Sequence, residues 1–420
     1  MQRRKRNAMQ GVTESRQDKM GQKNLGRKGL IAFIVLMNMF IPLSMDLYLP
    51  ALPKMNEYFG SSAAITNLTL SLFFLFYAIA ILVWGPLSDR YGRKPIIMVG
   101  SAIYIVSSIA CALSTNITLL IISRACQGIG SGGITSASMA IIKDCFTGKS
   151  RETILAVTQA ISGLAPMLAP IVGAWILYFT DWRGSFWLLA FISVINLVLT
   201  ILYQETLREE ERYRGSLIGS WSRLAVVAGN KSFIIPTLIF ALGSIHFMGY
   251  IAVSSYVYID YFGLSEQMYS YFFAANAFIS ILGPAIYIRF FLNFNKKRLA
   301  VLCFGLSALS GILIMTMGQL SPYIFLMGIV LMSLAGTVMR PFSTNILMEQ
   351  QKGDAGSMSS ILNMSFTLFG SLGMAIASIS WGNIVAGLGA LIAVGSGISI
   401  LAWYAFMKSD IPCAGVKDSQ

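Results

Sequence analysis

Four ionisable side chains stand inside long apolar stretches of this sequence: Asp46, Arg124, His246 and Arg340. Charged groups are costly in an apolar medium, so these residues are the first candidates for chemistry. A buried carboxyl group can take up a proton and release it when its surroundings change, because burial disfavours its charged form and a nearby cation favours it. Asp46 with Arg124 therefore predicts a proton-handling site, and the alternative is a purely structural ion pair.

The other two groups allow more than one interpretation. Arg340 either extends its side chain to the aqueous surface, contacts a substrate, or bonds one half of the chain to the other. His246 is either a packing residue or a second proton carrier, since an imidazole titrates near neutrality.

The sequence offers no other reactive cluster of a familiar kind. Its five cysteines have no paired spacing, so neither a disulfide framework nor a zinc site is expected. Gly128 to Gly133 match G-x-G-x-x-G by letter, but a dinucleotide site needs that pattern between a strand and a helix. No G-x-x-x-x-G-K-[ST] phosphate loop is present. We expect no catalytic residue, cofactor or metal, and an enzyme or a channel is a remote alternative.

The composition requires lipid as the solvent for these residues. The chain has 420 residues, 55% hydrophobic and 12% charged, with a mean hydropathy of +0.68, which is more apolar surface than one soluble core can bury. Stretches of 18 or more apolar residues can cross a hydrocarbon layer of about 30 Å as helices. Twelve such spans are predicted: 29–53, 64–86, 95–114, 117–142, 152–179, 184–204, 233–259, 268–290, 299–317, 322–348, 357–378 and 383–407.

The positions of the cations support the even number of spans. With the N-terminus inside, 27 of the 31 Lys and Arg residues fall in the tails, on alternate gaps or, for Arg289, at the edge of such a gap, as expected because cations collect on the cytoplasmic side. Both termini are therefore predicted to be cytoplasmic, in an inner membrane. The net charge of +13 indicates orientation and contact with membrane lipid, with no nucleic-acid partner.

A polar interval divides the twelve spans into two sets of six. We expect an all-α polytopic membrane protein in five parts: a basic tail 1–28, a six-helix half 29–204, a linker 205–232, a second six-helix half 233–407 and a tail 408–420. Two six-helix halves joined by a linker are typical of transporters whose substrate path lies between the halves.

Glycine and proline are concentrated in two spans. Gly128 and Gly132 have the small-xxx-small spacing of closely packed helices. Pro166 and Pro170 each remove a backbone hydrogen bond, so the fifth span is a candidate for bending. In the first hairpin, from Gly85 to Pro95, glycines allow a tight turn and Asp89 can pair with Arg93 or accept a hydrogen bond from a helix N-terminus.

With these motifs the chain resembles the major facilitator superfamily, and within it the twelve-span drug:proton antiporters of the Bcr/CflA type. The resemblance covers nearly all of the chain beyond the first tail and rests on five local matches. Met45 to Pro53 is similar to the first-span signature of that subgroup, which includes Tyr48. Gln204, before Glu205, stands where the family usually has Pro, and the hairpin after the eighth span lacks the Asp.

The resemblance implies roles for residues in three groups. Asp46 would be the membrane-embedded acid, and Arg124 with Gln127 would take part in proton transfer. Pro166, Pro170 and Gly173 would allow the fifth span to bend during exchange. The cytoplasmic gate motif would comprise Gly85, Asp89, Arg90, Gly92, Arg93 and Lys94, with Asp144 as its acidic partner.

The expected function is proton-coupled efflux of a drug or small metabolite by alternating access, from a monomer. One acid and two arginines among the buried groups favour neutral or anionic cargo, such as a siderophore or a carboxylate-bearing metabolite. A proton-coupled importer of the same fold is the nearer alternative. Expected substrate contacts are Arg340, His246, Tyr48 and Gln127.

Overall fold

The computed structural model describes residues 22–213, 224–350 and 355–417, and within these ranges the chain is helical, without a strand. Each of the three predicted polar segments, 1–28, 205–232 and 408–420, lies partly outside the described residues. Twelve helical stretches are long and apolar enough to cross a membrane, which confirms the predicted number.

Six of these stretches form the N-terminal half. In chain order they are α2 (Gly26–Asp46) continued by η1 (Leu49–Ala51) and α3 (Leu52–Phe59), α4 (Ala63–Thr66) with α5 (Leu68–Tyr91), α6 (Arg93–Ala112), α7 (Ile117–Cys145), α8 (Gly148–Phe179) and α9 (Arg183–Leu202).

The other six form the C-terminal half, after the short η2 (Glu209–Glu211) of the linker. They are α11 (Lys231–Ser255) with η3 (Tyr256–Tyr261), α12 (Glu266–Ile281) with α13 (Gly283–Ile286) and η4 (Tyr287–Phe291), α14 (Lys296–Thr316) with η5 (Gly318–Leu320), α15 (Pro322–Glu349), α16 (Ala355–Ala377) and α17 (Ile384–Lys408).

Local sequence explains where these helices begin and where they break. Asn116, Ser265 and Asn383 each accept a hydrogen bond from a backbone N–H of the first turn that follows, which satisfies donors that lack a partner within the helix. The first span breaks directly after Asp46, because Pro50 and Pro53 have no N–H to continue the α-helical ladder. The predicted span 29–53 is therefore two helices with a short 3₁₀ turn between them.

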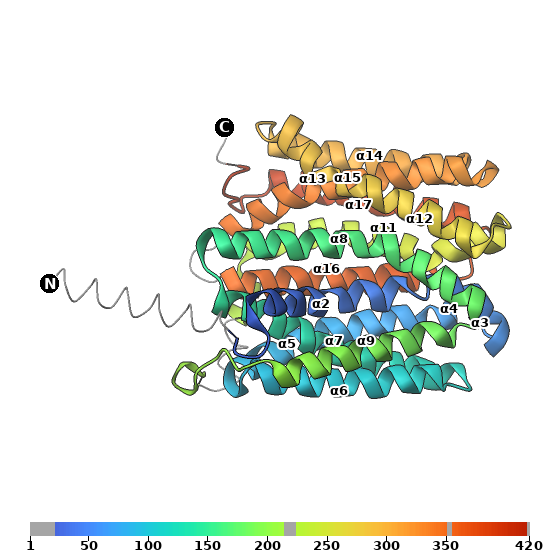
Figure 1. Ribbon diagram of the computed structural model, residues 1–420. Helices are drawn as coiled ribbons and strands as arrows, with labels where there is room; N and C mark the ends of the chain where they lie inside the picture. Colours follow the sequence, from blue (N-terminus) through green and yellow to red (C-terminus); the bar gives the residue numbers. More distant parts are fainter. Residues whose placement is uncertain (1–21, 214–223, 351–354, 418–420) are drawn as a thin grey trace.

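The helices run roughly side by side, and both described ends of the chain lie at the same end of the bundle (Figure 1). We call this the terminal end, where α2 begins and α17 ends, and the opposite one the distal end. The N-terminal half, blue to green, occupies the lower part of the view, and most of the C-terminal half, yellow to red, occupies the upper part (Figure 1). Helices α8 and α16 lie between them, and α8 contacts α12 while α16 contacts α5.

Two apolar cores hold the bundle together. One contains most of the buried residues of the N-terminal half and extends into the distal part of the C-terminal half, through residues such as Tyr258 and Phe325. The other lies within the C-terminal half around Phe240, Phe342 and Trp403. The shared core joins the halves at the distal end.

The glycines of α7 allow the close packing expected from their spacing. Gly128 faces the backbone of Phe73 on α5, and Gly132 faces Ala80, about two helical turns further along α5. A Cβ at Gly128 would overlap a backbone carbonyl, which cannot move aside as a flexible side chain can. The prediction of small-residue packing is therefore confirmed, and it brings α7 against the helix that carries one of Arg124's partners.

Candidate functional site

Asp46 is the last residue of α2 and is almost completely buried, with 3% of its surface exposed. Its Oδ1 atom has no hydrogen-bond partner in the described part of the chain. The carboxyl group lies within electrostatic range of Tyr269 on α12, in the other half. A buried acid with an unpartnered oxygen at the boundary between the halves can gain or lose a proton without breaking an existing ion pair.

Arg124 is completely buried on α7 and its guanidinium is bonded on several sides. Nε donates to the carbonyl of Thr69 at 3.2 Å, and Nη2 donates to the carbonyl of Ser44 at 3.0 Å. Nη1 donates to Gln127 Oε1, and Gln127 in turn donates to Ser108 Oγ at 2.7 Å. Arg124 thus ties α2 and α5 to α7, and its bond to Ser44 lies two residues before Asp46.

Aromatic rings enclose the same guanidinium. Its carbon lies 4.7 Å from the ring centre of Tyr48 and 4.2 Å from that of Phe73, distances at which a cation is attracted by the face of a ring. The Tyr48 hydroxyl is 3.0 Å from Thr69 Oγ1. Tyr48 and Gln127 therefore belong to the shell of Arg124.

Asp46 and Arg124 do not form a direct pair. Among the described residues no hydrogen bond or ion pair joins their side chains, because the guanidinium is already occupied by carbonyl oxygens, an amide and rings. The alternative interpretation, a structural ion pair between Asp46 and Arg124, is therefore not present in this structure. The link from Arg124 to Asp46 in this structure is the hydrogen bond to the backbone carbonyl of Ser44.

The two prolines of α8 lie within one continuous helix. The carbonyl of Pro170 accepts a hydrogen bond of 2.9 Å from Ser270 Oγ on α12, across the boundary between the halves. Gly173 packs against the carbonyl of Leu47, directly after Asp46. The predicted bending segment 166–173 therefore contacts both the chain beside the buried acid and the opposite half.

Contacts between the halves concentrate at the distal end. Lys54 Nζ forms an ion pair of 2.7 Å with Glu266, and Tyr256 OH donates to Asn56 Oδ1 at 3.3 Å. The amide of Asn67 donates to Ser378 Oγ at 2.8 Å and to the carbonyl of Ala252 at 3.0 Å. One turn deeper, Ser371 Oγ donates to the carbonyl of Ser71 at 2.8 Å.

No described hydrogen bond or ion pair joins the two helical halves at the terminal end, although Tyr213 of the linker donates its N–H to the carbonyl of Asp89. The charged hairpin between α5 and α6 makes its ion pairs within its own half. Arg93 donates to Asp89 Oδ1 at 2.6 Å and to Asp144 Oδ2 at 2.9 Å, and to Ser88 Oγ at 3.1 Å. The expected pairing of Asp89 with Arg93 is thus present, with Asp144 as a second acid on the same guanidinium.

The other hairpin residues have separate positions. Lys94 Nζ donates to the carbonyls of Ile201 and Tyr203, both at 2.8 Å. The backbone N–H of Lys94 donates to Glu205 Oε2. Arg90 is exposed and stacks on the ring of Tyr91.

The two glycines of the hairpin differ in role. Gly92 makes the turn, with a backbone φ of 107° that residues other than glycine rarely adopt. The expectation that Gly85 is part of the turn is wrong, because α5 continues to Tyr91 and places Gly85 inside the helix, near Ser136 of α7.

Gln204, which replaces the expected proline, has a structural explanation. Its N–H donates to Gln22 Oε1 at 2.7 Å, and Gln22 Nε2 donates to the carbonyl of Gln204 at 3.0 Å. A proline at this position would have no N–H for the first of these bonds. The reciprocal pair joins the chain just before α2 to the chain just after α9.

We expect Arg93→Gln to lower the thermal stability of the protein. Arg93 is 4% exposed, and its loss leaves Asp144, itself 14% exposed, without its cation, which costs about 3 kcal/mol when a buried pair is broken. The bond to Asp89 adds little because that acid is 57% exposed. The measurement is the Tm of the purified protein in detergent, which should fall by several degrees. Arg90→Gln, which removes a neighbouring exposed cation, is the control, and equal Tm values for both variants would contradict the expectation.

A cavity of about 260 Å³ lies among α11, α14, α15 and α16, with Phe74 of α5 completing its wall. His246 and Arg340 both line it, and no acid does. His246 Nε2 and Ser333 Oγ are buried without a hydrogen-bond partner among the described residues. Arg340 is exposed to this interior space. Of the four expected substrate contacts, the structure brings these two together, whereas Tyr48 and Gln127 lie apart from the cavity around Arg124.

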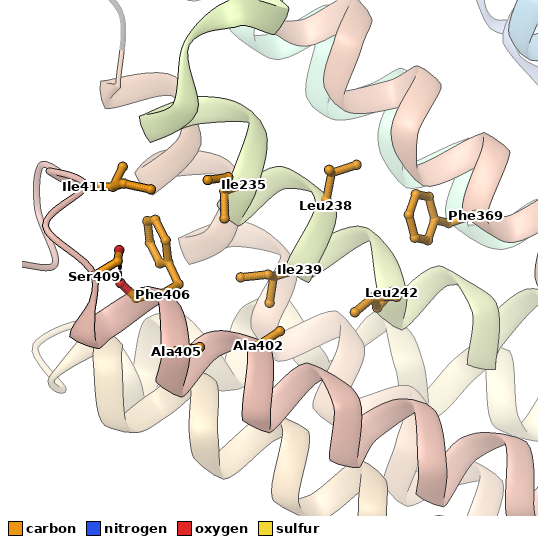
Figure 2. A pocket seen from close by; sticks show the side chains of 10 residues that line it. All are labelled: Ile235, Leu238, Ile239, Leu242, Phe369, Ala402, Ala405, Phe406, Ser409 and Ile411. Atoms are coloured by element: carbon orange, nitrogen blue, oxygen red, sulfur yellow. Dashed lines mark hydrogen bonds between the residues drawn. The ribbon is translucent and has the colours of Figure 1, made fainter.

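A second hollow, of about 440 Å³, is formed by α11, α16 and α17 near the terminal end (Figure 2). Its ten lining residues all have aliphatic or aromatic side chains, except for Ser409, which has a hydroxyl group (Figure 2). Such a surface offers no group that could orient a polar ligand. The cavity beside Arg340 is therefore the better candidate for a specific site.

Several residues of the site could not be singled out from the sequence. Asn67 closes the distal end, and Ser333, Asn363 and Thr367 contribute polar groups to the cavity. Isolated Ser, Thr and Asn residues are common in membrane helices, and nothing in their spacing distinguishes those that face a cavity. The ionisable residues were recognisable because a charge in an apolar stretch is rare.

Comparison with known proteins adds a family and a fold. The family model described as Major Facilitator Superfamily matches residues 33–374. The chain is 30% identical over 401 residues to the uncharacterized MFS-type transporter YdgK of Bacillus subtilis (strain 168), covering 93% of this chain and 98% of that relative. It is 28% identical over 266 residues to the multidrug resistance protein MdtL of Shewanella oneidensis, covering 63% of this chain and 66% of that relative.

Among solved structures, the crystal structure of a D-xylose-proton symporter superposes with a TM-score of 0.71. The sequence identity is 16%, and the match covers 92% of this chain and 98% of that one. At this identity the likeness concerns the fold: twelve helices in two six-helix halves.

Proposed function

This chain belongs to the Major Facilitator Superfamily, a family of membrane transporters, and we propose that it is an antiporter that exports a drug or small metabolite in exchange for protons. The observation that carries the proposal is the buried carboxyl group of Asp46 at the closed boundary between the halves, whose Oδ1 has no partner among the residues that the structure describes. The proposal also includes an inner-membrane location and a monomeric protein.

The terminal end is proposed to face the cytoplasm, because nearly all the Lys and Arg residues lie there or in the segments attached to it. In that orientation the described contacts between the halves close the outer side, and the structure corresponds to the inward-facing state of an alternating-access cycle. The hairpin from Asp89 to Lys94 would then hold the N-terminal half together on the cytoplasmic side while the halves move apart there.

Asp46 can couple its proton to that movement. With the proton bound, the neutral carboxyl group tolerates burial at the closed distal boundary. Without it, a carboxylate lacking a cation at this position would cost several kcal/mol, which favours opening the distal end and hydrating the group. Proton release to the cytoplasm therefore favours the outward-facing state that carries the substrate out, and proton uptake from outside favours the return.

This cycle needs no nucleotide. Each proton that enters along a membrane potential contributes about 2.3 kcal/mol per 100 mV, in addition to any pH gradient. Export, as opposed to import, is supported by the name of one relative, a multidrug resistance protein. It is also supported by the resemblance of Pro166, Pro170 and Gly173 to the antiporter motif. In this structure Gly173 packs against the carbonyl of Leu47, and the carbonyl of Pro170 accepts a hydrogen bond from Ser270 of the opposite half.

A growth screen tests the function directly. Drugs and toxic organic acids are supplied to a bacterial strain that lacks its own exporters, and survival is compared with and without the intact chain. We expect protection against at least one compound, together with lower accumulation of it in energised cells. A chain that never protects and instead raises accumulation would be an importer, and one that changes nothing would contradict export of these classes.

Cross-linking the distal end tests alternating access. We expect the double variant Lys54→Cys and Glu266→Cys, joined by a short bifunctional thiol reagent, to lose export almost completely, because the halves can no longer separate there. Cys126 is exposed and is first replaced by Ser. Export of the compound found in the screen is measured before and after the linker is cleaved, with each single cysteine variant as control. Unchanged export in the cross-linked protein would exclude opening at this end.

A further inference from the structure

We propose that the cavity beside Arg340 binds the anionic group of an amphipathic organic anion, whose apolar part lies against the aromatic side chains of the same cavity. This inference rests on the proposed transport function and names the class of substrate for it. It assigns Arg340 the substrate-binding role among the three interpretations that the sequence allows.

The charge of the cavity is the first argument. Arg340 lines the cavity and is exposed to it, and no described hydrogen bond or ion pair engages its guanidinium. The lining contains no Asp or Glu. A cation surrounded by apolar helices has to be compensated by water or by an anion. An anion with planar oxygens, such as a carboxylate, fits a guanidinium fork best.

The position of Arg340 does not fit the other two roles. It stands nine residues before the end of α15 at Glu349, roughly 13 Å from that end along the helix axis, and its side chain faces the cavity. The structure shows no bond from it to the N-terminal half among the described residues. Arg124, in contrast, is occupied by carbonyls and rings and has no free donor face for a ligand.

The neighbouring polar groups can complete the recognition of an anion. Ser333 Oγ is 2% exposed and has no partner among the described residues, so its hydroxyl is free to donate. Asn363 on α16 lines the same space, and among the described residues its amide makes only a 3.5 Å contact with Ser359. These groups come from two helices, α15 and α16, and a few polar groups in an otherwise apolar site can fix the orientation of a small molecule.

The rest of the lining combines hydroxyl groups with a larger apolar and mostly aromatic part. The hydroxyl groups belong to Ser244, Ser307, Thr337, Ser343 and Thr367. The apolar part consists of five phenylalanines, Phe74, Phe240, Phe247, Phe304 and Phe366, and three methionines, Met248, Met332 and Met339. A ligand with only a charge, such as a chloride ion, would leave this surface unused. A ligand with an aromatic or aliphatic body and one anionic group would use both parts of a space of about 260 Å³.

The test compares an anion with a neutral compound of the same shape. Purified intact protein in detergent, without any gradient, is titrated with radiolabelled 1-naphthoate and with radiolabelled 1-naphthamide. We expect the intact protein to bind naphthoate at least about tenfold more tightly than naphthamide. Arg340→Gln should remove that preference while naphthamide binding stays the same, and Arg340→Lys should keep part of it. Arg298→Gln, which removes a cation next to the N-cap of α14, is the matched control and should bind both compounds as the intact protein does.

Three results would overturn the inference. One is that the intact protein does not prefer naphthoate, including the case in which neither compound binds. Another is that Arg340→Gln keeps the preference. The third is that low chloride concentrations displace naphthoate with no contribution from the ring, which would make the site one for inorganic anions. Because binding is measured at equilibrium, an Arg340-dependent preference with no uphill transport of any compound would refute the proposed function alone.

Discussion

Asp46→Asn abolishes uphill, proton-driven transport in the mechanism proposed here, and we expect a fall of at least about 100-fold, to the level of protein-free vesicles. Asparagine has nearly the same size, so the packing beside Leu47 and Gly173 is kept. It cannot ionise, so no buried negative charge can destabilise the closed distal boundary. The inward-facing and outward-facing states therefore cannot differ in proton affinity at this position. The measurement is accumulation in proteoliposomes with an imposed pH gradient, using the compound found in the growth screen.

Two further measurements distinguish lost coupling from lost folding. Exchange of labelled for unlabelled substrate, without a gradient, should persist in Asp46→Asn because it needs only the substrate site. Proton release on substrate addition should be present in the intact protein and absent in the variant. Asp181→Asn, which removes an acid that is 57% exposed at the distal end, is the matched control and should transport normally. Full uphill transport by Asp46→Asn would remove Asp46 from the mechanism.

Arg124→Gln should damage both stability and transport. The guanidinium holds the carbonyls of Ser44 and Thr69, and no other described donor reaches them from α7. The carbonyl of Ser44, in the last turn of α2, loses its donor, and a buried carbonyl left without a partner costs about 1–3 kcal/mol. The carbonyl of Thr69 keeps its partner within α5, but the contacts with the rings of Tyr48 and Phe73 are lost as well. We expect a drop in Tm of several degrees, larger than that for Arg93→Gln, and transport near background for the protein that remains folded.

Arg124→Lys separates charge from geometry. A lysine keeps the positive charge near Asp46 but cannot donate to three separate acceptors in a fixed plane. If charge alone matters, the lysine variant transports as the intact protein does. If the connection through Ser44 matters, it resembles Arg124→Gln in transport while recovering part of the Tm. A glutamine variant with the Tm and transport of the intact protein would show that the Arg124 network is dispensable.

The twelve spans and their pairing into halves could be predicted because they follow from quantities that the sequence states directly. Apolar length sets the number of crossings, and the Lys and Arg residues mark alternate gaps. The positions at which helices break were harder to predict from the sequence. Pro50 and Pro53 lie within the first predicted span, but Pro42 lies in the same span without ending the helix, so the prolines alone did not place the break directly after Asp46.

The chemistry of the site was predictable in its residue types but not in its partners. Asp46 and Arg124 are recognisable as ionisable groups at similar depth, and a structural ion pair between them is the alternative that the sequence leaves open. The structure instead bonds Arg124 to the carbonyls of Ser44 and Thr69, which any residue could provide. The cavity beside Arg340 is likewise built from side chains of five helices, and helix contacts at that level are not encoded in hydropathy.

The paired amides of Gln22 and Gln204 have a mechanical consequence. They join the segment before the first helix to the segment after the sixth helix. A displacement of the chain at residue 204 is therefore transmitted to the first helix as well as to the sixth. In the proposed rocking movement, the first and sixth helices of the N-terminal half are therefore expected to move together.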